Sequence, residues 1–266
     1  MVQPEWVDSH CHLDFPVFDS DRAELIAEAT SKGLTHVFVP GVEPAQWFGL
    51  AALKRVFPSV CVGIGVHPWF VHRLAPELVL EEALVSACEL ISAVAIGETG
   101  LDRLAAERGG APMAKQLEVF EAHLRIAKQL CLPLVLHVVR AHGAALELLQ
   151  RYAPYPAGGV LHSYSGSAEF VPRYVALNFH LSFSGAVTRP NAKRAQSSAK
   201  VVPIERLLLE TDAPDQPPVG FVGRVPGRNE PVALVTVAEF VAQLRNTSPG
   251  SLLDFTRENA LRLYRL

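Results

Sequence analysis

The chain of 266 residues lacks the cysteine pairs and long apolar runs that mark several protein classes. No apolar stretch approaches the ~20 residues of a membrane span. The N-terminal segment carries Glu5 and Asp8 and has no apolar signal-peptide core. No C-x-x-C pair occurs, so we expect reduced, mostly buried thiols of a cytoplasmic protein. The cysteines are Cys11, Cys61, Cys88 and Cys131.

Excess charge of either sign is also absent, because the net charge is only -3. Bulk positive charge therefore gives no reason to expect non-specific nucleic-acid binding, although a local basic patch or a bound cation would still recruit phosphate. The hydrophobic fraction of 49% argues against disorder and supports a sizeable core. We find no repeat, low-complexity tract or linker, and ~250 residues suit a single α/β barrel. We therefore predict one domain over residues 1–266.

Short apolar runs alternate with segments of helical spacing along the whole chain. Near-continuous apolar strands between helices favour a parallel sheet that is buried on both faces. Eight such units predict a (β/α)₈ TIM-type barrel, an α/β fold whose active site lies at the carboxyl ends of the strands. The predicted strands are 6–7, 36–39, 60–66, 94–97, 133–136, 159–161, 180–183 and 207–209. The predicted helices are 21–32, 44–56, 77–91, 112–130, 142–152, 167–176, 190–201, 230–245 and 249–263.

Potential metal ligands follow the predicted strands. His10 and His12 come after the first strand, where alternate residues point to the same side and Cys11 between them points away. Imidazole and carboxylate ligands suit Zn, Mn, Ni, Fe or Mg. Six ligands exceed the three or four of one catalytic zinc and suffice for two metals that share a carboxylate. We therefore predict a metal-dependent hydrolase with one or two divalent ions. The other four ligand candidates are Glu98, His137, His162 and Asp212.

Each candidate also has a structural alternative. A histidine pair is also found on ordinary surfaces, and Asp212 before Ala213-Pro214 is also typical of a turn. A carboxylate after an apolar strand, as at Glu98, is costly to bury unless it is paired or metal-bound. Asp212 is the candidate proton acceptor for the attacking water. For Glu210 we expect a structural role or a role in supporting the ligands.

Substrate contacts are expected from residues near the same strand ends. His67 is a candidate for holding a phosphate or another substrate oxygen, and Arg140 for pairing with phosphate; the alternatives are a local hydrogen bond and an ion pair with a nearby acid. Asp102 either orients a ligand histidine or ends its strand. The Pro- and Gly-rich segment 213–229 is predicted to be a functional loop over the barrel mouth. We expect His36, His123 and His180 to be structural and leave His72 and His142 open.

Contacts with nucleic acid have their own candidates. Trp69, Phe70 and Phe221 are candidates for stacking on bases. The basic candidates have the alternative of a solvated helix face. They are Arg189, Lys193, Arg194, Lys200, Arg224 and Arg228.

Taken together, six stretches resemble the TatD family of metal-dependent deoxyribonucleases, among the amidohydrolase-like barrels. The resemblance covers nearly the whole chain in the order of the family's motifs. The stretches are Asp8-Ser9-His10-Cys11-His12-Leu13-Asp14-Phe15, Gly65-Val66-His67-Pro68, Gly97-Glu98-Thr99-Gly100-Leu101-Asp102, Pro133-Leu134-Val135-Leu136-His137, His162-Ser163-Tyr164-Ser165-Gly166 and Leu208-Leu209-Glu210-Thr211-Asp212-Ala213-Pro214.

The resemblance implies a distorted (β/α)₈ barrel with a mononuclear or dinuclear metal site, in which Glu98 bridges two metals. It also implies cleavage of DNA, often as a 3′ exonuclease. No lysine stands at the end of the fourth strand, which separates this chain from barrels with a carbamylated lysine. The chain departs from the family at 138–141, where Arg140 is kept but the following acid is not, and at 103–112, which replaces an aromatic-rich segment. The six matching ligand positions are His10, His12, Glu98, His137, His162 and Asp212.

These observations lead to a first hypothesis of a cytoplasmic metal-dependent phosphodiesterase that acts on DNA, with RNA as the alternative substrate, as a monomer without a membrane partner. Water bound to Zn, Mg, Mn or Ni attacks phosphorus, Asp212 accepts its proton, Glu98 holds the metals, and His67 with Arg140 steadies the phosphate. A second hypothesis keeps the metal site and changes the substrate to an ester or amide, such as an aminoacyl bond on tRNA or a small cyclic amide. A third is a non-enzymatic metal-holding scaffold.

Overall fold

The computed structural model describes residues 4–266, so the first three residues of the predicted domain lie outside it. Within these residues, strands and helices alternate as the sequence predicts. The strands follow one another in sequence order, β1 to β8, in one sheet, and the paired strands are parallel. They are β1 Trp6–Asp8, β2 Leu34–Pro40, β3 Val60–Ile64, β4 Ala95–Asp102, β5 Leu134–Val139, β6 Gly159–Leu161, β7 Phe179–Phe183 and β8 Leu207–Leu209.

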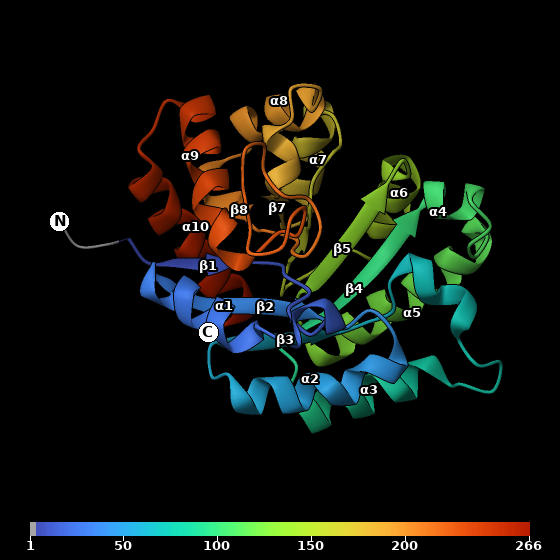
Figure 1. The fold of residues 1–266 in the computed structure, drawn as a ribbon. Coiled ribbons are helices and arrows are strands. Elements are labelled where there is room, and N and C mark those ends of the chain that lie inside the picture. Colours follow the sequence, from blue (N-terminus) through green and yellow to red (C-terminus); the bar gives the residue numbers. More distant parts are fainter. Residues whose placement is uncertain (1–3) are drawn as a thin grey trace. The chain divides into compact units, whose positions relative to one another are not determined.

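Amphipathic segments form the helices between these strands (Figure 1). The helices are α1 Arg22–Ser31, α2 Pro44–Val56, α3 Leu80–Ile91, α4 Arg103–Glu107, α5 Met113–Leu130, α6 His142–Tyr152, α7 Val171–Ala176, α8 Lys193–Val201, α9 Leu234–Arg245 and α10 Pro249–Tyr264. Six 3₁₀ turns occur among the described residues: η1 Pro16–Phe18, η2 Pro68–Arg73, η3 Ala168–Phe170, η4 Gly185–Thr188, η5 Ile204–Arg206 and η6 Pro231–Ala233.

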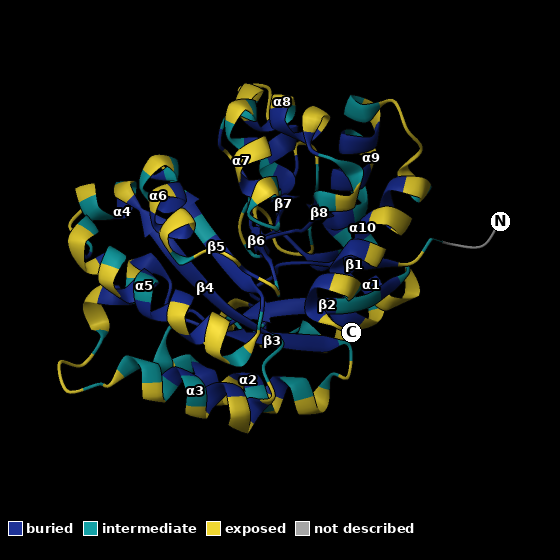
Figure 2. Ribbon diagram, turned by 180° about the vertical axis from the view of Figure 1, so that it is seen from behind, coloured by how far each residue is buried: buried dark blue, intermediate teal, exposed yellow. Residues whose placement is uncertain are grey.

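The strands are buried along most of their length, as apolar strands of a parallel sheet should be. Every residue of β3, β4 and β7 is buried. Figure 2 shows the strands in the colour of buried residues and the helices with exposed outer faces. The core is therefore built between the sheet and the inner faces of the helices.

Several element ends differ from the predicted ones. β4 continues through Glu98 to Asp102, and β5 continues through His137 to Val139, because the β4–β5 ladder pairs Gly100 with His137 and carries on past the apolar residues. β1 extends one residue further, to Asp8, and His10 and the residues after it lie beyond the strand. The short helix α4 was not predicted. Apolar runs locate the strands, but backbone pairing decides where they end.

The chain groups into two compact units, each described here by itself. Unit 1 comprises residues up to 39, 162–171 and 181–266, and unit 2 comprises residues 40–161 and 172–180. In unit 1, Tyr264 of α10 stacks on Phe38 with ring centroids 4.4 Å apart, and its hydroxyl donates to the Ser9 carbonyl at 3.0 Å. These contacts hold the last helix against the first two strands.

In unit 2, polar side chains attach the helices to β4 and to the end of β3. The amide of Gln116 on α5 accepts from the Asp102 N–H at 2.7 Å and donates to the Asp102 carbonyl at 3.0 Å. Trp47 of α2 donates to the Gly65 carbonyl at 2.9 Å. At Gly100, where φ is +140°, an added Cβ would lie 2.1 Å from the His137 carbonyl oxygen, so only glycine lets β4 approach β5 this closely.

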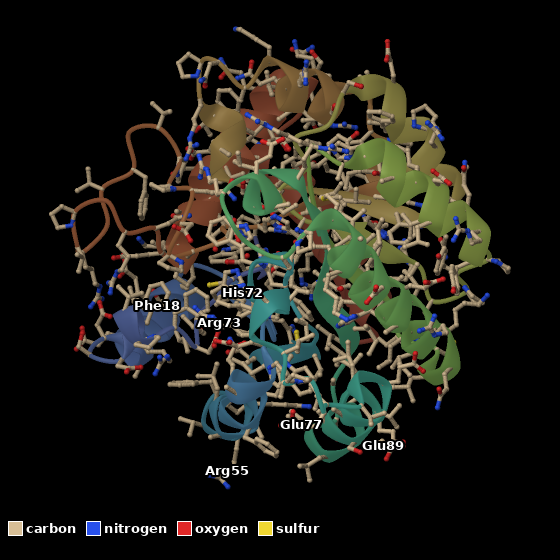
Figure 3. The ribbon with its side chains drawn as sticks, turned by 90° about the vertical axis from the view of Figure 1, so that its right-hand side faces the viewer. Phe18, Arg55, His72, Arg73, Glu77 and Glu89 are labelled. Carbon is tan, nitrogen blue, oxygen red and sulfur yellow. The ribbon has the colours of Figure 1, made fainter. Side chains whose placement is uncertain are left out.

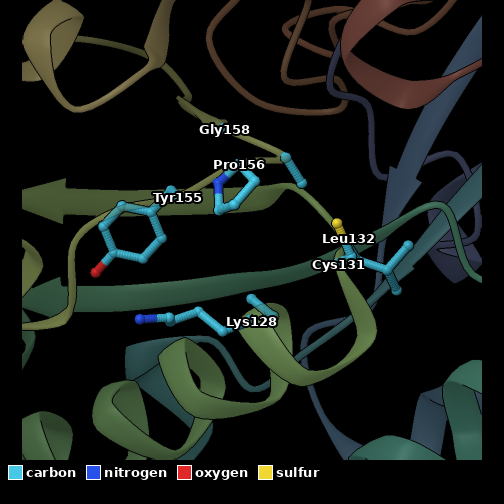
Figure 4. Close-up of a pocket in the computed structure, with 8 residues that line it drawn as sticks. Lys128, Cys131, Leu132, Tyr155, Pro156 and Gly158 are labelled. Carbon is cyan, nitrogen blue, oxygen red and sulfur yellow. The ribbon is translucent and has the colours of Figure 1, made fainter.

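The cysteines largely follow the prediction, since Cys11, Cys61 and Cys88 are buried. Cys131 is exposed instead, because it ends α5 in a left-handed conformation beside a pocket of 20 Å³ (Figure 4). That pocket has room for about one water molecule, so it is too small for a substrate. Among residues 4–266, none of the helices combines the length and the apolar character that crossing a membrane requires.

Candidate metal-binding clusters

In unit 1, three of the predicted ligands converge beyond the ends of β1 and β8. The Nε2 atoms of His10 and His12 lie 3.4 Å apart, and Asp212 Oδ1 lies 3.6 and 3.5 Å from them. All three residues are buried. Ligand atoms at 2.0–2.1 Å from a tetrahedral zinc lie about 3.4 Å from one another. The three side chains therefore fit one divalent ion of this kind, and their nitrogen and carboxylate donors suit it.

The backbone of unit 1 explains this convergence. The Asp212 N–H donates to the His10 carbonyl at 2.9 Å, and the His12 N–H donates to the Ala213 carbonyl at 2.8 Å. These bonds pair the segment after β1 with the segment after β8. The prediction that strand alternation places both histidines is wrong, because β1 ends at Asp8. The two segments bond to each other instead.

A buried carboxylate strengthens the same pairing. Asp8 is fully buried and accepts from the Thr211 hydroxyl at 2.5 Å and from the Thr211 N–H at 3.0 Å. Burial raises the pKa of Asp8 to about 8, although the hydrogen bonds from Thr211 and His10 oppose that rise. The Cys11 side chain lies 3.7 Å from the Ala213 carbonyl, and it is absent from the ligand triangle, as expected.

His162 lies beside this cluster. Its ring stacks on His10 with centroids 4.1 Å apart, and its Nδ1 lies 3.6 Å from Glu210 Oε1 and 3.9 Å from Asp212 Oδ1. Glu210 is fully buried and accepts from the Ser163 N–H. Glu210, which directly follows β8, therefore fixes the chain next to His162.

Asp212 is ionised in this setting. Burial opposes its charge, but the hydrogen bond with His12 and the nearby imidazoles of His162 and His10 lower its pKa to about 2. Gln216, four residues later, donates to the other carboxylate oxygen, Oδ2. Gln216 is not among the predicted site residues, because its only signal in the sequence is an amide in a Pro-rich loop close to a ligand.

In unit 2, two histidines contact the carboxylate of Glu98. Glu98 Oε1 lies 3.3 Å from His67 Nε2 and 3.1 Å from His137 Nδ1, and the two rings are 4.2 Å apart. Glu98 is 1% exposed, so its carboxylate is compensated within the protein or by a cation. The set of donors and the spacing again suit a divalent ion.

The two histidines of this cluster present different ring atoms. His137 Nε2 lies 3.2 Å from Asp102 Oδ2; a carboxylate only accepts, so Nε2 carries the proton, and the lone pair of the neutral ring is at Nδ1, on the side of Glu98, where it would bind a cation. His67 Nδ1 accepts from the Trp69 N–H at 3.1 Å, so the proton of the neutral ring is on Nε2. His137 is thus arranged as a metal ligand and His67 as a hydrogen-bond donor.

Asp102 both ends β4 and orients His137, so the two roles considered for it coexist. It accepts from the Ala105 N–H at 2.9 Å and from Trp69 Nε1 at 2.6 Å. Burial raises its pKa, but the hydrogen bonds from His137, Ala105 and Trp69 outweigh it and hold the pKa well below the usual range. Trp69 therefore has a local partner, although its side chain is still 53% exposed.

His123 is structural, as expected, and it also supports His67. It is completely buried on α5, donates through Nδ1 to the Val119 carbonyl at 2.7 Å and accepts at Nε2 from the Val66 N–H at 3.0 Å. Burial lowers its pKa to about 4. The open cases lie apart from the clusters: His72 is exposed on η2 next to Arg73 (Figure 3), and His142 Nδ1 contacts the Tyr174 hydroxyl at 2.9 Å.

The loop 213–229 pairs both of its predicted nucleic-acid contacts with acids of the chain; Arg228 is buried and therefore not available to a nucleic acid, whereas Arg224 stays exposed. Arg228 is 6% exposed, pairs with Asp21 and Glu230, and lies over the Phe18 ring at 5.0 Å. Arg224 pairs with Glu24 and Glu28 of α1. The loop is thereby attached to α1 and to the turn before it.

The other basic candidates remain exposed. Arg140 directly follows β5 in unit 2, with 65% of its side chain exposed and its Nη1 3.7 Å from Glu107. The remaining four lie on or just before α8 in unit 1. They are Arg189, Lys193, Arg194 and Lys200.

Known proteins are similar to this chain over its whole length. A sequence model of TatD related DNases matches residues 7–265. The uncharacterized metal-dependent hydrolase YabD of Bacillus subtilis is 33% identical, with 97% of this chain and 98% of that protein covered. A protein of Cronobacter sakazakii named 3'-5' ssDNA/RNA exonuclease TatD is also 33% identical, with 93% of each covered.

Solved structures agree with these relatives. The crystal structure of YjjV, a TatD homolog from Escherichia coli, is 29% identical, covers 100% of both chains and gives a TM-score of 0.90. Together with the strand order, this match confirms the predicted (β/α)₈ TIM-type barrel. The chain belongs to the TatD-related family of metal-dependent hydrolases.

Proposed function

We propose that this protein is a metal-dependent phosphodiesterase that cleaves DNA from its 3′ end. The observation that carries the proposal is the buried triangle of His10, His12 and Asp212, with ligand atoms 3.4–3.6 Å apart. His162 adds a donor in unit 1, and Glu98 and His137 supply ligands in unit 2. A divalent ion held in either of these clusters would activate water and polarise the phosphate.

The residues of this chain have separate tasks in that reaction. Asp212 is ionised and takes the proton of the attacking water. The Nε2–H of His67 donates to a phosphate oxygen, because its Nδ1 is occupied by the Trp69 N–H. Arg140 contributes a guanidinium that adds positive charge for the phosphate.

The substrate class has two independent supports. The relative from Cronobacter sakazakii is named as an exonuclease of single-stranded DNA and RNA. In unit 1, four exposed basic side chains follow β7 and line α8, which suits a polyanionic strand. On these grounds we propose DNA as the substrate, and we include RNA as a second substrate in the test.

End-labelled single-stranded DNA and RNA, incubated with Mg²⁺, Mn²⁺ or EDTA, test this function. We expect metal-dependent laddering from the 3′ end, and a loss of at least about 100-fold in Asp212→Asn. Glu98→Ala should abolish turnover while circular dichroism shows an intact fold. Cleavage that persists in EDTA, or with the purified Glu98→Ala variant, would contradict the mechanism.

A second candidate is hydrolysis of an ester or amide at the same metal site. The internal pairing of Arg224 and Arg228 favours it, because this loop then offers fewer cations to a phosphate. Aminoacyl-tRNA and cyclic amides tested beside the DNA would decide. Uncut DNA together with a rapidly cut ester or amide would replace the first proposal by the second.

A further inference from the structure

A hydrogen-bonded network in unit 1 surrounds the side of Asp212 that faces away from the histidines. Gln216 Nε2 donates to Asp212 Oδ2, and Gln216 Oε1 accepts from the hydroxyls of Ser163 at 2.8 Å and Ser184 at 2.7 Å. The two hydroxyls are 3.0 Å apart. Gln216 thus joins the segments that follow β6, β7 and β8.

The chemistry of these groups leaves one orientation for the amide. A carboxylate only accepts, so the NH₂ group of Gln216 has to face Asp212. The amide oxygen then faces the two hydroxyls, which can both donate to its lone pairs. Both polar ends of Gln216 are therefore used, and its side chain is fixed at both ends.

The two oxygens of Asp212 consequently have different surroundings. Oδ1 lies 3.6 Å from His10 Nε2 and 3.5 Å from His12 Nε2, whereas Oδ2 is bonded to Gln216. The backbone is also unusual here: Ser163, Asp212 and Gln216 have positive φ values of 41°, 57° and 54°. Residues other than glycine rarely adopt this conformation, and such residues cluster at functional sites.

We propose that Gln216 is a positioning residue that, with Ser163 and Ser184, turns Asp212 so that only Oδ1 faces a cation at His10 and His12. The inference rests on the metal-binding part of the proposed function and is independent of the substrate. Gln216 holds the Asp212 carboxylate in an orientation that offers one oxygen before the cation binds. Cation binding then does not have to restrict the rotation of this carboxylate.

Cobalt affinity, measured by calorimetry and by the visible absorption of Co²⁺, tests this role without any substrate. Gln216→Met keeps the length and removes all three hydrogen bonds of the side chain, and we expect a 10- to 100-fold weaker affinity. Gln216→Glu places a second carboxylate against Asp212 and should weaken binding further at neutral pH. Ser184→Ala removes one hydroxyl and should show a smaller loss in the same direction.

Two variants of unit 1 serve as controls. Gln196→Met removes an amide that donates to the Val187 and Arg189 carbonyls, away from the cluster. Val222→Ala alters the loop 213–229, which contains Gln216, at a residue that is 87% exposed. Both should bind Co²⁺ within about twofold of the wild type and keep its spectrum.

The outcomes separate this inference from the proposed function. If folded Gln216→Met binds Co²⁺ like the wild type, the positioning role is overturned even when DNA is cleaved. If the wild type binds Co²⁺ but cuts no DNA, the substrate proposal fails and the affinity order of the variants still decides the role of Gln216. A wild-type protein that binds no Co²⁺ would overturn both.

Discussion

Single ring atoms distinguish ligands from helpers in unit 2. His67 and His137 both contact Glu98, but their second nitrogens meet opposite partners: a backbone N–H for His67 and a carboxylate for His137. Both rings therefore carry the proton on Nε2, but His67 presents this protonated nitrogen to Glu98 and His137 presents its unprotonated Nδ1. Residue type alone does not contain this information.

The two histidines should respond differently to truncation. His137→Ala removes a lone pair aimed at the cluster and should reduce the bound metal measured by elemental analysis. His67→Ala should keep the metal and lower kcat by about 100-fold, since it removes a donor. Equal metal loss in both variants would contradict the assigned tautomers.

The buried His123 predicts a pH dependence of stability. Its pKa is about 4 in the fold and 6.5 as an ordinary histidine, so between these values only the unfolded chain binds the proton. Its contribution is complete above pH 6.5 and falls as the pH falls toward 4. Relative to His123→Leu, the wild type should lose about 2 kcal/mol of unfolding free energy between pH 7 and pH 5. Urea titrations of both proteins at pH 7 and pH 5 measure this loss. A difference in unfolding free energy between wild type and His123→Leu that stays the same at both pH values would refute the prediction.

At the scale of elements, the loop after β8 is held by charge. Arg228 is buried against Asp21 and Glu230, whereas the pairs of Arg224 with α1 are more exposed. Removing one partner of a buried pair leaves the other charges uncompensated, but an exposed pair contributes little. The two arginines of one loop should therefore differ in energetic weight.

Arg228→Ala should lower the free energy of unfolding by about 3 kcal/mol, and Arg224→Ala by less than about 1 kcal/mol. Urea denaturation of both variants in low salt provides the comparison. Equal losses would show that burial does not set the cost here.

The sequence predicts the elements better than it predicts their ends. Apolar runs locate every strand, and the ligand types after those runs identify both clusters. Glu98 lies within β4 and His10 lies beyond β1 because ladder hydrogen bonds decide where a strand stops. Gln216, Ser163 and Ser184 are polar residues of ordinary loops, and only the folded chain shows that they meet around Asp212.

At the scale of the molecule, metal binding should couple to stability. The three-ligand clusters of both units are formed by residues distant in sequence, so an ion binds the folded chain and not the unfolded one. At 100 times Kd, such binding adds about 2.7 kcal/mol. For a chain of this size, that corresponds to a rise of roughly 5 °C or more in Tm.

Calorimetry of the wild type with EDTA and with added Co²⁺ should show this rise. His10→Asn should lose part of the rise in Tm, and the exposed substitution Val222→Ala should keep the full rise. Identical Tm values for the wild type in both conditions would count against metal binding.

The hydrogen bond from the Tyr264 hydroxyl to the Ser9 carbonyl joins two segments that the ribosome makes at different times. The ribosome makes His10 and His12 before α10, and a domain folds as a unit once its parts have emerged. The residues of the Glu98 cluster have all left the ribosome while Asp212 is still to be added. A nascent chain therefore carries its first two histidines unassembled until Asp212 has been added and α10 has emerged.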